Sequence, residues 1–255
     1  MTDSPDYERR FGGMARLYGA DGAARLRAAH VVVIGIGGVG SWAAEALARS
    51  GVERLTLADL DHVAESNINR QVHALDATLG QAKVLAMKQR IGAINAACVV
   101  DCIEESVTPD NAVTLLPPCD AVIDAIDQVR AKAALIAHCR RAGIALVTTG
   151  GAGGRSDPVQ LRVDDLARTI QDPLASKVRA TLRREYGFPR DTKKRFGVDC
   201  VYSLEPVRRP QSPACDVDEA GLHGLNCAGY GSSVCVTAAF GFAAAARAQA
   251  LILRL

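Results

Sequence analysis

The chain has 255 residues, of which 49% are hydrophobic, and its 30 Lys and Arg residues against 28 Asp and Glu residues leave a formal net charge of +2. This length and apolar content suffice to bury a sizeable core, which excludes an intrinsically disordered protein. The nearly balanced charge excludes a protein that binds a polyanion over its whole surface, so any nucleic-acid contact has to be local.

Residues 1–28 are polar and rich in arginine, and we expect them to form an arm followed by a short helix. Residues 29–255 are expected to form one α/β domain, because no linker isolates a second one. Val31–Ile34 is a continuous apolar run, which is typical of a strand buried on both faces of a parallel sheet.

A glycine-rich turn follows this run and leads into a stretch of good helix formers that ends at Gly51. The turn contains Gly35, Gly37, Gly38 and Gly40. Between a strand and a helix, such glycines let the backbone approach phosphate groups, and the N-terminus of the helix favours negative charge. The turn predicts a nucleotide site but does not distinguish ATP from NAD.

The alternation of strands and helices continues beyond this turn. The expected elements are strand 54–58, helix 82–91, strand 98–103, a helix after Thr108-Pro109, strand 121–126, helix 130–141 and strand 144–149. This order predicts a doubly wound, mostly parallel sheet of the Rossmann type. The rhythm then breaks, and we expect a C-terminal elaboration. It contains strand 159–163, a charged helix 174–186 and a long connection through Gly224 that is rich in proline and charge.

The apolar stretch 234–246 is interrupted by Arg247, which leaves it well short of the roughly 20 residues needed to cross a bilayer. We expect a buried or dimer-packed helix here and no membrane anchor. The eight cysteines, without a secretory segment at the start, favour a reducing, cytoplasmic location. Their spacing contains no Cys-x-x-Cys pair, so no zinc is expected. Cys227 is interpreted as a buried thiol rather than a nucleophile.

Polar side chains follow the second predicted strand. Asp59 ends that strand, where an acidic side chain accepts hydrogen bonds from ribose hydroxyls, as it would in an NAD dehydrogenase. The block after it contains Asp61, Asn67, Arg70, Gln71 and Lys83. Hydride transfer has no need for so many phosphate-directed cations, whereas attack at an α-phosphate develops charge that Arg and Lys stabilise. Asp127 lies at the carboxyl end of strand 121–126, where a Mg²⁺ ligand would be useful.

These motifs form a set. They are Gly-Ile-Gly-Gly-Val-Gly (35–40), Asp59-x-Asp61, Asn67-x-x-Arg70-Gln71, Lys83 and Ala-Ile-Asp (125–127). As a set, spread over about 120 residues, they resemble the adenylation core of the E1-like superfamily, the ThiF-MoeB type. Further stretches extend the resemblance over nearly the whole chain. They are similar to the branch of this superfamily that cyclises threonylcarbamoyladenosine in tRNA. They are residues 10–13, 17–19, 37–49, 148–154, 169–174 and 197–201.

The resemblance implies ATP and Mg²⁺ as cofactors and tRNA carrying threonylcarbamoyladenosine as substrate. It also implies a homodimer and, as further partners, sulfur-transfer proteins of the cysteine desulfurase type. The glycine turn would cradle the ATP phosphates and Asp59 would hold the ribose. Asn67, Arg70 and Lys83 would stabilise charge at the α-phosphate, and Asp127 would position Mg²⁺. In relatives an N-terminal arginine also reaches the phosphates, sometimes across the dimer, and the candidates here are Arg10, which we assign to the site, and Arg16.

The implied reaction begins with attack of the threonyl carboxylate on the α-phosphate, and the side chain's own carbamoyl group then closes a ring and releases AMP. Three alternatives stay open at this point. The chain could activate the C-terminus of a ubiquitin-like sulfur carrier, although those activators have the zinc-binding Cys-x-x-Cys pairs that this sequence lacks. It could be an NAD-dependent oxidoreductase, or an inert scaffold for sulfur transfer.

A basic segment offers a place for tRNA. Between Ser176 and Arg195 the chain has eight Lys or Arg residues and two acidic residues, an excess of eight minus two, or +6. Lys193, Lys194 and Arg195 are the predicted contacts with backbone phosphates, and the modified base is expected near residues 150–154. A solvated helix and loop with long side chains would explain the same charges.

Overall fold

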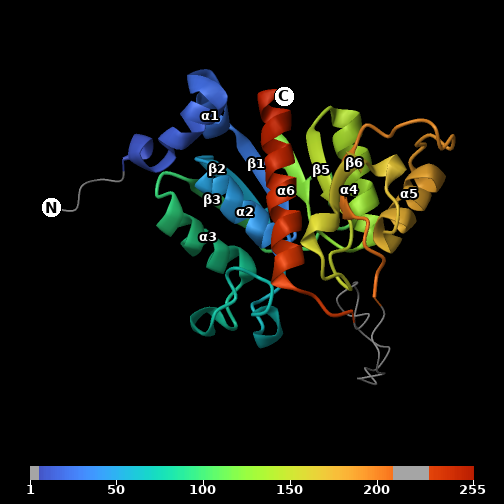
Figure 1. Ribbon diagram of the computed structural model, residues 1–255, viewed down its shortest axis with the longest axis horizontal. Helices are drawn as coiled ribbons and strands as arrows, with labels where there is room; N and C mark the ends of the chain where they lie inside the picture. Colours follow the sequence, from blue (N-terminus) through green and yellow to red (C-terminus); the bar gives the residue numbers. More distant parts are fainter. Residues whose placement is uncertain (1–5, 209–229) are drawn as a thin grey trace.

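The computed structural model describes residues 6–208 and 230–255. One sheet runs through this part of the chain, with the strand order β3-β2-β1-β4-β5-β7-β6 (Figure 1). The strands are β1 (His30–Ile34), β2 (Arg54–Ala58), β3 (Val99–Ile103), β4 (Ala121–Asp124), β5 (Ala145–Thr149), β6 (Leu161–Asp165) and β7 (Asp199–Ser203). All neighbouring strands are parallel except β6, which is antiparallel to β7. The predicted doubly wound, mostly parallel sheet is confirmed.

Helices cover both faces of the sheet. They are α1 (Tyr7–Ala28), α2 (Gly40–Arg49), α3 (Lys83–Ile94), α4 (Val129–Ala142), α5 (Pro173–Glu185) and α6 (Val234–Leu253), with short 3-10 turns η1 (Glu65–Asn67), η2 (Asp76–Thr78), η3 (Pro158–Gln160) and η4 (Leu166–Arg168). Because side chains alternate along a strand, Val31 and Val33 of β1 join the core with α2, α3 and α6. Val32 and Ile34 join the core with α4 and α5.

The last helix, α6, crosses one face of the sheet beside α2 (Figure 1). Its contact with α2 is close, because a Cβ on Gly241 would lie 2.5 Å from the carbonyl oxygen of Val39. By length and composition alone the helix could cross a membrane, but Phe240 and Ala244 are fully buried in the core. The helix is longer than predicted and continues past Arg247 to Leu253. The charge of Arg247 is balanced by Asp199 of β7, at 2.7 Å.

Three further expectations about the elements need correction. The helix predicted after Thr108 is wrong, since residues 109–114 form turns. Thr108 and Asn111 hydrogen-bond each other's backbone N–H as in a capping box, and the N–H groups of Ala112 and Leu115 make helical i→i−4 bonds. Pro117 and Pro118 then stop the helix from extending beyond this turn. The N-terminal helix is not short, because α1 extends to Ala28 across a break at Gly19, where φ is 76°. Strand β7 lies in a segment that we expected to be an irregular connection.

Candidate functional site

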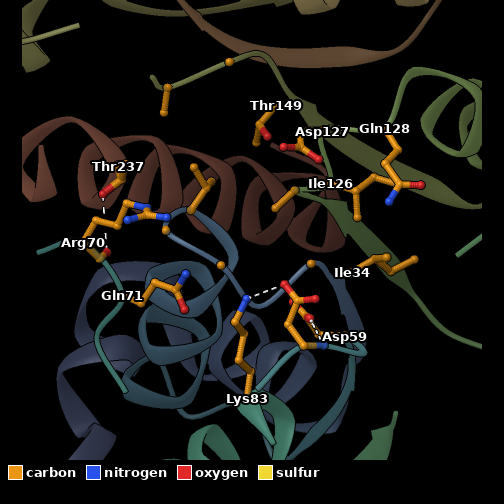
Figure 2. Close-up of a pocket in the computed structure, with 18 of the residues that line it drawn as sticks. Ile34, Asp59, Arg70, Gln71, Lys83, Ile126, Asp127, Gln128, Thr149 and Thr237 are labelled. Carbon is orange, nitrogen blue, oxygen red and sulfur yellow. Dashed lines mark hydrogen bonds and ion pairs between the residues drawn. The ribbon is translucent and has the colours of Figure 1, made fainter. Parts of the chain in front are cut away.

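A pocket of about 320 Å³ opens at the carboxyl ends of β1, β2, β4 and β5. Most of the residues predicted for the nucleotide site line it (Figure 2). These residues are Gly35, Gly37, Gly38, Asp59, Asp61, Asn67, Arg70, Gln71, Lys83 and Asp127. The sequence motifs identified these residues without indicating how close together they lie. The parallel sheet brings them together because the carboxyl ends of its strands lie at one edge.

Two glycines of the turn between β1 and α2, Gly35 and Gly40, have no room for a side chain. Gly35 has a φ of 85°, and a Cβ there would lie 3.0 Å from the backbone of Ala125. Gly40 does not line the pocket but begins α2, and a Cβ on it would lie 1.8 Å from the carbonyl oxygen of Gly35. The turn therefore places the N-terminus of α2 at the pocket, where it favours an anion.

The carboxylate of Asp59 is tied to this turn. Its oxygens accept hydrogen bonds from the backbone N–H of Ile36 at 2.6 Å and of Asp61 at 2.9 Å. Burial raises the pKa of Asp59, and the nearby charge of Lys83 opposes part of that rise. The side chain is thus fixed at the end of β2, where it can accept a hydrogen bond from a ribose hydroxyl.

Two cations approach the pocket from the segment after β2. Lys83 opens α3 with a side chain that is 7% exposed, and its Nζ lies 2.7 Å from Asp61 Oδ2. The backbone of Arg70 is held by Trp42, whose Nε1 donates to the Arg70 carbonyl oxygen at 2.9 Å. Burial lowers the pKa of the Arg70 guanidinium, and Figure 2 shows Arg70 and Lys83 at the pocket. Partly desolvated cations of this kind can stabilise charge on a phosphate.

The other side of the pocket is formed by the loop after β5, residues 150–153, with Ser232 and Thr237. Asp172 accepts a hydrogen bond from the N–H of Gly151 at 3.0 Å and pairs with the fully buried guanidinium of Arg155 at 3.3 Å. A Cβ on Gly150 would lie 2.0 Å from Asp172 Oδ2. Asp172 and Arg155 therefore fix the position of this loop at the edge of the pocket.

The residues present are compatible with Mg²⁺ that arrives with a nucleotide. Asp127 contributes a carboxyl group on the opposite side of the pocket from Lys83 (Figure 2). Mg²⁺ is usually held by one or two carboxylates together with phosphate oxygens and water, so a dense cluster of ligands is unnecessary. Within residues 6–208 and 230–255, no group of three or more His, Cys, Asp or Glu side chains could hold a metal.

Other predicted residues do not reach the pocket. Arg10 is exposed, and its Nη1 donates to the carbonyl oxygen of Ile94, at the opposite end of α3 from Lys83. Arg10 therefore does not line the pocket of its own chain. Lys193, Lys194 and Arg195 are exposed on the connection after α5 and do not line the pocket. Cys227 lies outside the described residues.

The motifs missed several residues of the site. Glu105, Ser106 and Val107 line the pocket from the loop after β3. Lys132 and Asp124 do not line the pocket but form a fully buried ion pair at 2.9 Å, and Asp124 precedes Asp127 by three residues. A lysine inside the apolar run of α4 is the only sequence signal that could have pointed to this pair.

The comparisons with known proteins cover nearly the whole chain. The ThiF family profile matches residues 7–254. The tRNA threonylcarbamoyladenosine dehydratase of Haemophilus influenzae is 48% identical, covering 97% of this chain and 94% of that protein, and the one from Escherichia coli is 50% identical, covering 96% and 94%. The crystal structure of the Escherichia coli enzyme in complex with ATP has a TM-score of 0.89 at 47% identity, covering 100% of this chain and 98% of that one. A second structure of that enzyme contains AMP, with the same TM-score.

Proposed function

This chain belongs to the ThiF family, and within it to the tRNA threonylcarbamoyladenosine dehydratases, and we propose that it uses ATP to cyclise threonylcarbamoyladenosine in tRNA. One observation carries the proposal: a single pocket combines a phosphate-binding glycine turn, the cations Arg70 and Lys83, and the carboxyl group of Asp127. The test is whether the chain removes one water from this nucleoside when supplied with Mg²⁺ and ATP.

In the first step, the threonyl carboxylate attacks the α-phosphorus of ATP. A new P–O bond forms, the bond to the β-phosphate breaks, and pyrophosphate leaves. Arg70 and Lys83 stabilise the charge that develops on the phosphate oxygens, while Asp59 holds the ribose. Asp127 would hold Mg²⁺, which supplies charge neutralisation on the phosphates when bound.

In the second step, the carbamoyl group of the same side chain attacks the carbonyl carbon of the acyl-adenylate. The bond to AMP breaks, a proton is lost from the attacking group, and the ring closes. Because the nucleophile is already tethered to the electrophile, this step gains from proximity and needs no cysteine of the enzyme. The loop 150–153 would hold the modified base next to the α-phosphate.

The tRNA backbone is proposed to lie along the connection after α5. Lys193, Lys194 and Arg195 are exposed there, while other cations of the same segment are engaged within the fold. Arg179 donates to the hydroxyl of Thr169, and the Arg183 guanidinium lies 5.2 Å from the ring centroid of Phe196. Fewer cations are therefore available to phosphates than the net charge of the segment indicates. The predicted tRNA contact is limited to residues 193–195.

The predicted homodimer would give Arg10 a role that its own chain does not offer. Since Arg10 lies away from the pocket that contains Lys83, it could reach an ATP phosphate only in the pocket of a second copy. A cytoplasmic location and sulfur-transfer partners of the cysteine desulfurase type belong to the same proposal. The match to dehydratases over nearly the full length favours this function over a sulfur-carrier activator, an NAD oxidoreductase or an inert scaffold.

A further inference from the structure

One of the largest fully buried side chains of the described residues is a lysine. Lys132 lies in the middle of α4 with a side chain that is 2% exposed, and its neighbours Ala133 and Leu135 belong to the hydrophobic core between α4 and the sheet. Burying an ammonium group costs several kcal/mol unless its charge and its hydrogen bonds are satisfied. Core packing alone does not explain a lysine at this position.

Each contact of the Lys132 ammonium is with the end of β4. Nζ lies 2.9 Å from Asp124 Oδ1 and donates to the backbone carbonyl oxygens of Asp124 at 3.2 Å and of Ile126 at 2.9 Å. The two carbonyls belong to the turn that takes the chain from the buried strand to Asp127. One cation therefore fixes the direction of the backbone immediately before the carboxyl group assigned to Mg²⁺.

The same point is tied to the neighbouring strand. Thr148 of β5 donates its hydroxyl to Asp124 Oδ2 at 2.7 Å, and the hydroxyl of Thr149 donates to the Asp124 carbonyl oxygen at 3.3 Å. The loop 150–153 follows directly after Thr149. Asp124 and Lys132 thus lie behind both halves of the pocket, and Ala125 between them packs against Gly35 of the glycine turn.

We propose that Lys132 is a positioning residue of the adenylation site, which holds the Asp124–Ile126 backbone so that the Asp127 carboxyl group meets the metal-bound phosphates of ATP. The inference rests on the proposed function, because it assigns Asp127 to Mg²⁺. Residues that orient a metal ligand without touching the metal commonly change metal affinity or activity by about 10-fold to 100-fold when replaced. Lys132 acts through Asp127 and contacts no substrate.

The test measures nucleotide affinity calorimetrically in three forms: AMP, ATP with a chelator, and ATP with saturating Mg²⁺. In the native chain, Mg²⁺ should increase the affinity for ATP. In Lys132→Met that gain should fall by about 10-fold or more, while the affinity for AMP should change by less than about 2-fold, because the glycine turn and Asp59 are unaltered. Activity is not needed for this readout.

Glu45→Gln is the matched control. Glu45 is a buried acid of α2 that accepts hydrogen bonds from Arg49 and Arg90 and does not line the pocket. Its replacement disturbs a buried ion pair elsewhere, so it should lower the unfolding temperature and leave the Mg²⁺ gain intact. If Lys132→Met behaves like this control, the role of Lys132 is only structural and the proposal is overturned.

Lys132→Arg covers the case in which Lys132→Met does not fold. It keeps a cation opposite Asp124, but in this fully buried position the larger, planar guanidinium displaces the two carbonyls that the ammonium holds. A reduced Mg²⁺ gain in folded Lys132→Arg supports the proposal, and an unchanged gain contradicts it. If the native chain itself binds no nucleotide, the proposed function fails first, which separates that result from a failure of the positioning role alone.

Discussion

Gly40 and Gly35 approach each other so closely that a Cβ on Gly40 would lie 1.8 Å from the Gly35 carbonyl oxygen. No side chain fits this contact, because the obstacle is backbone. We predict that Gly40→Ala displaces the start of α2 and weakens ATP binding by at least about 10-fold, since the N–H groups facing the phosphates move with it. Titration of ATP measures this directly.

Gly92→Ala is the control for that substitution. Gly92 lies inside α3, and its Cβ would meet nothing within 4 Å. Because alanine favours a helix by about 1 kcal/mol over glycine, this variant should be as stable as the native chain or more so, with unchanged ATP affinity. Equal ATP affinity in both variants would show that the glycine turn does not contact the nucleotide.

The cations of the pocket predict the products. Because Arg70 and Lys83 are suited to stabilise charge during attack at the α-phosphate, the chain should form AMP and pyrophosphate, and ADP would contradict the mechanism. Lys83→Ala and Asp127→Ala should each lower turnover by about 100-fold or more. Lys88→Ala, an exposed lysine on the same helix as Lys83, should turn over normally. Near-normal rates in both pocket variants would contradict the site assignment.

His73 predicts a dependence of stability on pH. Burial, with the charges of Lys83 and Arg90, lowers its pKa from 6.5 to about 4, and neither ring nitrogen has a partner among the described residues. Between these pH values the unfolded chain binds a proton that the folded chain excludes. The folded state therefore loses stability as the pH falls through this window, by roughly 3 kcal/mol in total.

Replacing this side chain should remove that loss. In His73→Leu, the free energy of unfolding from urea titrations should fall less between pH 6.5 and pH 4 than in the native chain. At pH 7 and above, the lowered pKa of His73 does not change the free energy of unfolding, because the imidazole is neutral in both the folded and the unfolded state. Parallel pH profiles of the two proteins would contradict a buried, neutral His73.

The exposed cations after α5 predict a tRNA contact. Replacing Lys193, Lys194 and Arg195 together with glutamine should raise the apparent KM for tRNA and flatten the salt dependence of binding by about one logarithmic unit per lost contact. ATP affinity should stay the same, because these residues do not line the pocket. Unchanged tRNA affinity and salt dependence would indicate a solubilising surface and direct the search to the arginines of α1.

The sheet and the nucleotide residues could be predicted because both depend on local patterns. Apolar strands such as Val31–Ile34 alternate with helices, and Asp59 and Asp127 each follow a strand whose end is fixed by the parallel sheet. The helix expected after Thr108 failed because Pro117 and Pro118 end it after a single turn, although Thr108 and Asn111 form the side-chain contacts of a helix start. Strand β7 has only a short apolar stretch, residues 200–202, inside a segment rich in proline and charge, so no periodic pattern identified it.

Other parts of the site depend on contacts between distant segments. The position of Arg10 relative to Lys83 follows from how α1 packs, which a motif does not contain. The Arg155–Asp172 pair and the clamp formed by Lys132 depend on the burial of single charged side chains within otherwise apolar or glycine-rich stretches. Only the folded chain shows which carbonyl or carboxylate satisfies each of these charges.

On the proposed function, this pocket activates the carboxylate of threonylcarbamoyladenosine in tRNA. The most direct measurement is mass analysis of nucleosides from tRNA that carries this modification, before and after incubation with the purified chain, Mg²⁺ and ATP. We expect the threonylcarbamoyl nucleoside to disappear and a nucleoside lighter by one water to appear, with AMP formed in equal amount. Lys83→Ala should convert the nucleoside about 100-fold more slowly than the native chain. An unchanged nucleoside mass under conditions in which the native chain binds ATP would contradict the account.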